Sequence, residues 1–531
     1  MFPKRLELFS SAGGAIGGAL ACALLFCGPA RADTNAVPDY GSAFGMFAAF
    51  GLETVEPGGQ YVALSLDEPG VQQQQPVANV SQLPFLGKAW VWPGTNGQPT
   101  RYLFLGGLGG FCRAAEQTAS EPAADPLPRA SWTRRDADLA KDVAGVLRVL
   151  RGPAKDAEAD GEEDGSGDYV RGQFAQAEPA GALLLAAVHV HQAGLKDEAN
   201  EIADLVFRLA QDRSTVVRQA VAHLAQSRYA AAGTRLAATR NWKAYRDELR
   251  DVLDRYGTAW DKAPGLEILI AKVDRQIAGT PPAGEGLDED AARFFADVSP
   301  EDVQLLTYLK LAVAINPAVQ LGLLSAPEGE RAKRFFARGI HVIPALLAVV
   351  DSDYLLPAAV DASYSYRYRS YSYSSGDEKG LKSAEEIYKE LENKPPVLGD
   401  VAAELLNVVV PQPAQPFRGE DGKSNAVAAA RAFYAAHAAD SPMQLAAHYL
   451  AEGDEAQRSS VVETLIHSKD SNVLALAESR LFSSNIWSQS SYAVLDPSTI
   501  SLIQSYVLQH PERAAAVLPD FLETTKAQLP E

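Results

Sequence analysis

Residues 182–209 read ALLLAAVHVHQAGLKDEANEIADLVFRL, and this stretch decides the fold class that we expect. On each side of a short polar bend at Gly194, apolar residues recur every three to four positions, which is the period of an amphipathic α-helix. The sequence therefore predicts helices over 182–192 and 199–209, joined as a hairpin.

The same period continues on both sides of this hairpin. It predicts further helices over 139–150, 216–224, 242–256 and 266–277. The third of these carries an apolar stripe through four turns, made of Trp242, Tyr245, Leu249, Val252, Leu253 and Tyr256.

Helix-start signals extend the pattern toward the C-terminus. Ser383-Ala384-Glu385-Glu386 fits a capping box, and Ser441-Pro442 combines a capping residue with a proline at the first helical position. We expect about fifteen helices joined by short loops, with no alternation of strands and helices. Consecutive hairpins of this kind predict a mainly α protein whose helical hairpins stack into an α-solenoid rather than form one compact bundle.

Strand character is confined to residues from about 60 to 105. Residues 61–66 alternate apolar and polar side chains, and the apolar runs 90–92 and 102–105 flank a turn that contains Asn96-Gly97. Asn-Gly is a frequent reversal of a two-stranded hairpin. The sequence thus predicts a small antiparallel β element in the N-terminal region.

The first thirty-two residues have the features of a secretory signal. Lys4 and Arg5 precede an apolar stretch over 12–26, and Ala30-Arg31-Ala32 is a small-x-small cleavage pattern. We expect cleavage near Ala32 and an exported protein, periplasmic or extracellular; retention of the segment as an anchor is the alternative. No later stretch is apolar enough to span a bilayer, so we expect no stable membrane insertion after signal removal.

Composition excludes several classes of protein. The chain has 531 residues, of which 47% are hydrophobic and 22% charged, which is globular rather than disordered or collagen-like. The net charge of −19 argues against a nucleic-acid partner, because surfaces that bind nucleic acid are basic. After removal of 1–32, Cys112 is the single cysteine, so neither an internal disulfide nor a multi-cysteine metal site is expected.

Stretches rich in Gly, Pro and acidic residues divide the chain. They lie at 152–172, 278–286 and 411–422. The predicted regions are the signal peptide 1–32, a β-containing region 33–127, a helical-hairpin region 128–280, a helical region 281–415 with an insert at 361–379, and a C-terminal helical region 416–531.

Two stretches resemble helical repeat families. Residues 182–207 resemble a tetratricopeptide-type hairpin, with the turn Gly194 and the small Ala199 at the matching places. Residues 338–351 resemble the second half of a HEAT repeat, and 397–403 resemble the following helix of such a pair. These resemblances imply a superhelical interaction scaffold and specify no partner.

The usual catalytic and metal-binding motifs do not fit. Gly422-Lys423-Ser424 lacks the earlier glycine of a phosphate-binding loop, and the acidic run 156–161 lacks the closing glutamate of a calcium loop. His189 and His191 are two positions apart on a helix and point in different directions, and His437 and His448 are interpreted as ordinary helix histidines. There is no His-Glu-x-x-His and no Gly-x-Ser-x-Gly. We predict no cofactor and no metal.

The insert is the best candidate for binding. Residues 363–375 read SYSYRYRSYSYSS, which places five tyrosines and two arginines in thirteen residues of an acidic chain. Flat rings with hydroxyl groups suit contacts with protein, peptide or sugar. A low-complexity insert without a ligand is the alternative. The candidate binding residues are Tyr364, Tyr366, Arg367, Tyr368, Arg369, Tyr371 and Tyr373.

These observations favour an exported, non-catalytic helical protein that acts as a scaffold for protein or peptide partners. Two other functions stay open. One is a hydrolase of cell-envelope polymers that uses two carboxylates distant in the sequence. The other is a carbohydrate-binding protein that uses Trp90 and Trp92, a hypothesis that fails if both indoles are buried.

Overall fold

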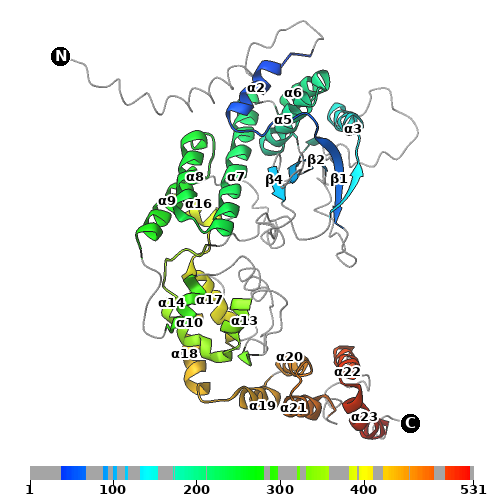
Figure 1. Ribbon diagram of the computed structural model, residues 1–531, viewed down its shortest axis with the longest axis vertical. Helices are drawn as coiled ribbons and strands as arrows, with labels where there is room; N and C mark the ends of the chain where they lie inside the picture. Colours follow the sequence, from blue (N-terminus) through cyan, green and yellow to red (C-terminus); the bar gives the residue numbers. More distant parts are fainter. Residues whose placement is uncertain are drawn as a thin grey trace, which may run out of the picture. The chain divides into compact units, whose positions relative to one another are not determined.

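The computed structural model describes residues 37–66, 88–93, 100–104, 114–117, 132–152, 171–172, 174–210, 212–279, 287–296, 320–322, 330–357, 382–391, 394–410, 422–453, 455–482 and 497–526. The chain divides into two compact units (Figure 1). The first contains residues 1–278 and 361–394, and the second contains 279–360 and 395–531.

The first unit contains a five-stranded antiparallel sheet in the order β4-β3-β2-β1-β5. Its strands are β1 (Gln60–Leu66), β2 (Lys88–Trp92), β3 (Thr100–Phe104), β4 (Ala114–Gln117) and β5 (Trp132–Asp136). The predicted strands correspond to β1, β2 and β3, and the register pairs Tyr61 with Trp90 and Trp90 with Leu103. The edge strands β4 and β5 were not predicted, because their short polar sequences, AAEQ and WTRRD, lack a clear apolar alternation.

Helices make up most of the first unit. They are α2 (Gly41–Ala49), α3 (Leu139–Arg151), α5 (Ala177–Gln192), α6 (Lys196–Ala210), α7 (Arg213–Thr239), α8 (Trp242–Tyr256), α9 (Ala263–Ala278) and α16 (Ala384–Glu390). Helices α5 and α6 form the predicted hairpin, and Gly194 adopts a positive φ of 99° at its bend, a conformation that favours glycine.

Each long helix of this unit packs on its neighbours in sequence. Helix α5 contacts α6 and α7, α7 contacts α8, and α8 contacts α9. Side-chain caps fix several starts: Asp212 accepts hydrogen bonds from the first backbone N–H groups of α7, and Asn241 does so for α8. Helix α7 is longer than the predicted 216–224, because an Ala-rich run extends it to Thr239; Arg240 follows and ends it with a left-handed backbone.

Helix α16 is distant in sequence from α9 yet packs on it. Ser383 and Glu386 form the capping box that the sequence predicts. Gly265 on α9 allows the close approach, since a Cβ there would lie 2.7 Å from the backbone nitrogen of Tyr388. Helix α16 therefore packs on α9 through a close contact that leaves no room for a side chain at position 265.

Helices make up most of the described residues of the second unit. Its helices are α10 (Glu289–Ala296), α13 (Glu330–Phe336), η1 (Gly339–Val342), α14 (Ile343–Val349), α17 (Leu398–Val409), α18 (Gly422–His437), α19 (Pro442–Glu452), α20 (Glu455–Leu465), α21 (Ser471–Leu481), α22 (Pro497–Gln509) and α23 (Pro511–Lys526). The HEAT-like stretch 338–351 corresponds to η1 and α14, and α14 packs on α17. Helices from α19 to α23 again contact sequence neighbours around one apolar core.

The expectation of a mainly helical chain with a small antiparallel sheet is confirmed. Ser441 caps α19 and Pro442 follows it, as the sequence predicts, and Gln444 completes a capping box that was not predicted. Among the described helices, none combines the length and the apolar composition that a bilayer span requires.

Candidate functional site

The predicted binding residues of the insert, from Tyr364 to Tyr373, lie outside the described residues, as do Cys112 and the acidic run 156–161. The described part of the chain offers a different candidate. It is a segment near the N-terminus, residues 39–56, that lies on helices of the first unit. We call these residues the N-terminal segment.

Apolar side chains anchor the N-terminal segment. Tyr40, Phe44 and Phe47 recur at the spacing of one helical face, on and just before α2, and all are buried. The Tyr40 ring meets Phe207 of α6 edge-on at 5.6 Å between centroids, and Phe44 meets His191 of α5 at 5.3 Å. An apolar face inserted between helices is a common way for a helical peptide to bind a helical protein.

Polar side chains of the underlying helices bond to the main chain of the segment. Asn200 accepts from the Tyr40 N–H at 2.9 Å, and Gln192 accepts from the Val55 N–H at 3.0 Å. Three further side chains donate to backbone carbonyl oxygens: His189 to Glu53 at 2.8 Å, Arg228 to Gly51 at 3.1 Å, and Tyr256 to Phe50. The helices α5 to α8 thus hold this segment as a peptide, through its backbone as well as its rings.

His189 is the most buried polar group of this site. Its side chain has no exposed surface, and burial lowers its pKa from 6.5 to about 4, so the ring is neutral at pH 7. A neutral ring that meets a carbonyl oxygen through Nε2 carries its proton on that nitrogen. The Trp90 indole of β2 packs edge-on against the ring, with 6.0 Å between the two ring centroids.

A buried carboxylate lies at the start of the segment. Asp204 of α6 is 3% exposed, accepts from the Tyr40 hydroxyl at 3.4 Å and forms an ion pair with Arg208 one turn later. Burial raises the pKa of Tyr40 to about 12, so the hydroxyl remains a donor. The ion pair with Arg208 and the hydrogen bond from Tyr40 compensate for the burial of this carboxylate.

The junction between the sheet and α3 contains a second such cluster. Asp142 accepts from the Lys88 ammonium at 2.6 Å and from the Tyr61 hydroxyl at 3.0 Å. Burial, followed by the charge of Asp142, raises the pKa of Tyr61. Both buried aspartates of the described chain, Asp142 and Asp204, therefore have a cationic partner.

The two indoles of β2, Trp90 and Trp92, differ in exposure. Trp90 is buried at 3% exposure between Tyr61 and His189. Trp92 is partly exposed, but its Nε1 donates to the Glu56 carbonyl at 3.2 Å, and the Arg101 guanidinium lies 5.5 Å from its ring centroid. Trp90 is therefore not available to stack on a sugar, whereas Trp92 keeps part of its ring exposed.

The Gly422-Lys423-Ser424 motif lies at the start of a helix. Lys423 and Ser424 belong to the first turn of α18, and Lys423 lies 3.4 Å from the Asp351 carboxylate. In the described part of the chain, no three side chains of His, Cys, Asp or Glu gather closely enough to hold a metal ion.

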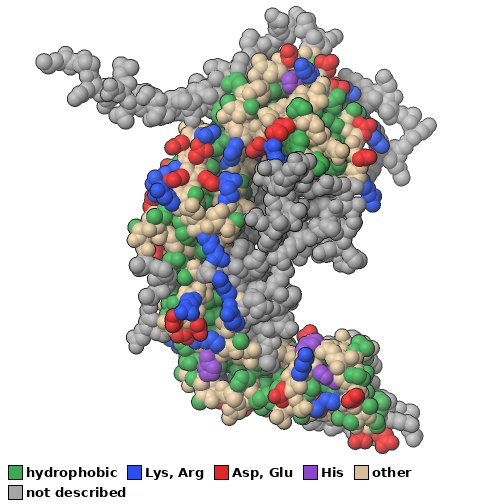
Figure 2. Space-filling model, in the orientation of Figure 1, with side chains coloured by type: hydrophobic (Ala, Val, Ile, Leu, Met, Phe, Trp, Pro, Cys, Tyr) green, Lys and Arg blue, Asp and Glu red, His purple; other side chains and the backbone are tan. Residues whose placement is uncertain are grey.

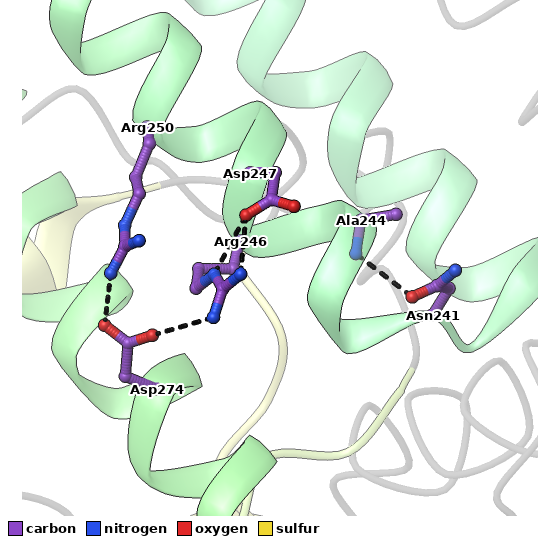
Figure 3. A network of polar contacts seen from close by, with 6 residues as sticks. All are labelled: Asn241, Ala244, Arg246, Asp247, Arg250 and Asp274. Carbon is purple, nitrogen blue, oxygen red and sulfur yellow. Dashed lines mark hydrogen bonds and ion pairs between the residues drawn. The ribbon is translucent and has the colours of Figure 1, made fainter.

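Charged side chains on the surface pair with one another. In Figure 3, Arg246 and Arg250 of α8 both reach Asp274 of α9, at 3.6 and 2.8 Å, while Arg246 also bonds to Asp247. On the face that Figure 2 shows, acidic and basic side chains are interspersed over the helices of the first unit. Such exposed pairs contribute little stability, and we assign the network to the contact between α8 and α9.

The contacts of the N-terminal segment were not predicted from the sequence. Its signal is present as the run GSAFGMFAAFGL at 41–52, whose aromatic residues fall three apart. Only the folded structure shows which helices receive them. Comparisons with protein families, with curated proteins and with solved structures find no match to this chain.

Proposed function

We propose that this chain is an exported, non-catalytic protein whose helical hairpins stack as a solenoid and bind a protein or peptide partner. The observation that carries the proposal is the manner in which α5 to α8 hold the N-terminal segment. Five side chains bond to its backbone, and aromatic anchors fill the spaces between helices. Main-chain hydrogen bonds of this kind provide affinity and anchor pockets provide specificity in peptide recognition.

Packing between sequence neighbours supports the stacked arrangement. From α5 to α9, and again from α19 to α23, each helix contacts the next. A stack of this type leaves a long lateral surface on which partners bind. Export is part of the same proposal, and N-terminal sequencing of the protein from the cell envelope tests it: a mature chain that starts near Asp33 agrees with cleavage, and an intact Met1 contradicts it.

The experiment asks whether the helical surface recognises a peptide in trans. A protease site placed at the exposed turn Pro57–Gly58 lets the chain fold intact and then frees the N-terminal segment by cleavage. A fluorescent peptide of residues 37–56 is then added and its anisotropy is followed. We expect the added peptide to bind saturably, and we expect Asn200→Ala in the protein to weaken its affinity at least tenfold.

The matched control is the same peptide with Phe44 and Phe47 replaced by serine, which keeps the backbone and removes the anchors. Equal binding of both peptides contradicts peptide recognition at this surface. So does the absence of binding by the unsubstituted peptide while the cleaved chain keeps its helical circular dichroism.

The tyrosine-rich insert remains our proposal for a second partner contact. Replacement of Tyr364, Tyr366 and Tyr368 by serine is expected to reduce the recovery of partners from the exported fraction and to leave helical content unchanged. Undiminished recovery by the triple variant excludes the insert as the contact.

A further inference from the structure

Two histidines of the second unit pack ring against ring. His437 is the last residue of α18, and His448 lies on α19, with the two ring centroids 5.1 Å apart. The side chains are 19% and 39% exposed, so an ion from solvent can reach them. From the sequence alone, both are interpreted as ordinary helix histidines.

The Nδ1 atom of each ring faces a carboxylate. The Nδ1 of His437 lies 2.7 Å from the Asp440 carboxylate, and the Nδ1 of His448 lies 3.6 Å from that of Glu452. Within the part of the chain that the structure describes, the Nε2 atoms of these two rings have no hydrogen-bond partner. A histidine whose Nδ1 faces a carboxylate and whose Nε2 is available has the arrangement that carboxylate–histidine–zinc sites use.

The spacing of the rings also suits a shared ion. Two imidazoles that bind one ion through Nε2 at about 2.0–2.1 Å, with a tetrahedral angle between them, place their centroids about 5 Å apart. The local charge is favourable, because two carboxylates lie beside the pair and the negative end of the α18 dipole is at His437. Phe433 packs on His437 at 4.8 Å and restricts its rotation.

We infer that His437 and His448 bind one divalent transition-metal ion, of the kind that prefers imidazole, through their Nε2 atoms, with water completing the coordination. No third protein ligand lies with them in the described residues, so the ion exchanges readily. Imidazole nitrogen favours Zn²⁺ and Cu²⁺ over Mg²⁺ and Ca²⁺, and Cu²⁺ binds more tightly than Zn²⁺. This inference is independent of the proposed function.

Isothermal titration of the full chain with ZnCl₂ and with MgCl₂ tests the site. We expect one equivalent of Zn²⁺ and no heat from Mg²⁺ above dilution. His437→Ala and His448→Gln each weaken Zn²⁺ binding at least tenfold, and Asp440→Asn weakens it by about tenfold because it loosens the ring orientation.

His467→Ala is the matched control. This histidine also faces a polar side chain through Nδ1, the Gln509 amide at 2.9 Å, and we expect the variant to bind Zn²⁺ as the unsubstituted chain does. Circular dichroism verifies that each variant keeps its helices. If His437→Ala does not fold, His448→Gln tests the site. Absence of Zn²⁺ binding by the unsubstituted chain, or equal binding by folded His437 and His448 variants, overturns the inference.

Discussion

Acidification is expected to loosen the N-terminal segment mainly through His189, with a smaller contribution of the same sign from His191, whose pKa is also lowered by burial. In the folded chain burial holds the pKa of the His189 ring at about 4, whereas a free histidine titrates near 6.5. Between these two values the unfolded chain binds more protons than the folded chain, so a fall in pH favours unfolding. The contribution of His189 to stability is therefore complete above pH 6.5 and is lost as the pH falls to about 4.

The size of the effect follows from the two pKa values. At about 1.4 kcal/mol for each pKa unit, the difference between 6.5 and about 4 is worth about 3 kcal/mol. A protonated His189 ring can still donate to the Glu53 carbonyl. However, the ring packs beside Trp90 and has no surface exposed to water, so its charge would not be hydrated. Protonation of His189 in the folded chain therefore costs free energy because it creates a buried charge.

Hydrogen exchange read by mass spectrometry measures this effect locally. Amides of residues 39–56 are followed at pH 7, 6, 5 and 4, with rates corrected for the intrinsic pH dependence of exchange. We expect the free energy of local opening to fall by about 3 kcal/mol, and His189→Gln to remove most of this slope because an amide does not titrate.

His223→Gln is the matched control, since His223 also meets a backbone carbonyl, that of Glu178, but is not buried. We expect it to keep the slope of the unsubstituted chain. If the unsubstituted chain and His189→Gln lose protection equally between pH 7 and 4, the reasoning from burial is refuted.

Three further predictions concern packing and caps. Phe47→Ala removes a fully buried ring and should lower the free energy of unfolding of the first unit by about 3–5 kcal/mol in urea titrations; a change below about 1 kcal/mol would show that α2 is not anchored there. Gly265→Val forces a side chain against the backbone of α16 and should speed proteolysis within 382–391, with unchanged cleavage counting against the close contact. Asp470→Ala removes the cap of α21 and should cost about 1 kcal/mol, while Asp470→Asn retains most of it; equal losses in both variants would exclude a capping role.

Local sequence signals predicted the elements of this chain well. The helix 242–256 has the predicted bounds, the capping box at Ser383 forms as expected, and Ser441 and Pro442 start α19 as expected. These features depend on hydrogen bonds and side-chain periods within a few residues, which a sequence displays directly. Strands β4 and β5 escaped prediction, because edge strands are specified by their partners more than by their own residues.

The candidate sites depend on contacts between distant residues. The N-terminal segment meets side chains more than 130 positions away, and its aromatic residues alone do not reveal which helices receive them. Similarly, His437 and His448 are eleven positions apart on separate helices, so their ring contact depends on the turn between α18 and α19.

By itself, the sequence determined the helical class, the small sheet and the ends of many helices, because the period of the apolar residues and the chemistry of caps act over one or two turns. Only the tertiary structure decided that α16 packs on α9 at Gly265, that the N-terminal segment is held through its backbone, and that His189 is buried beneath Trp90. The physical reason is that burial and hydrogen bonding between segments depend on how the helices pack together, and packing is a property of the whole unit.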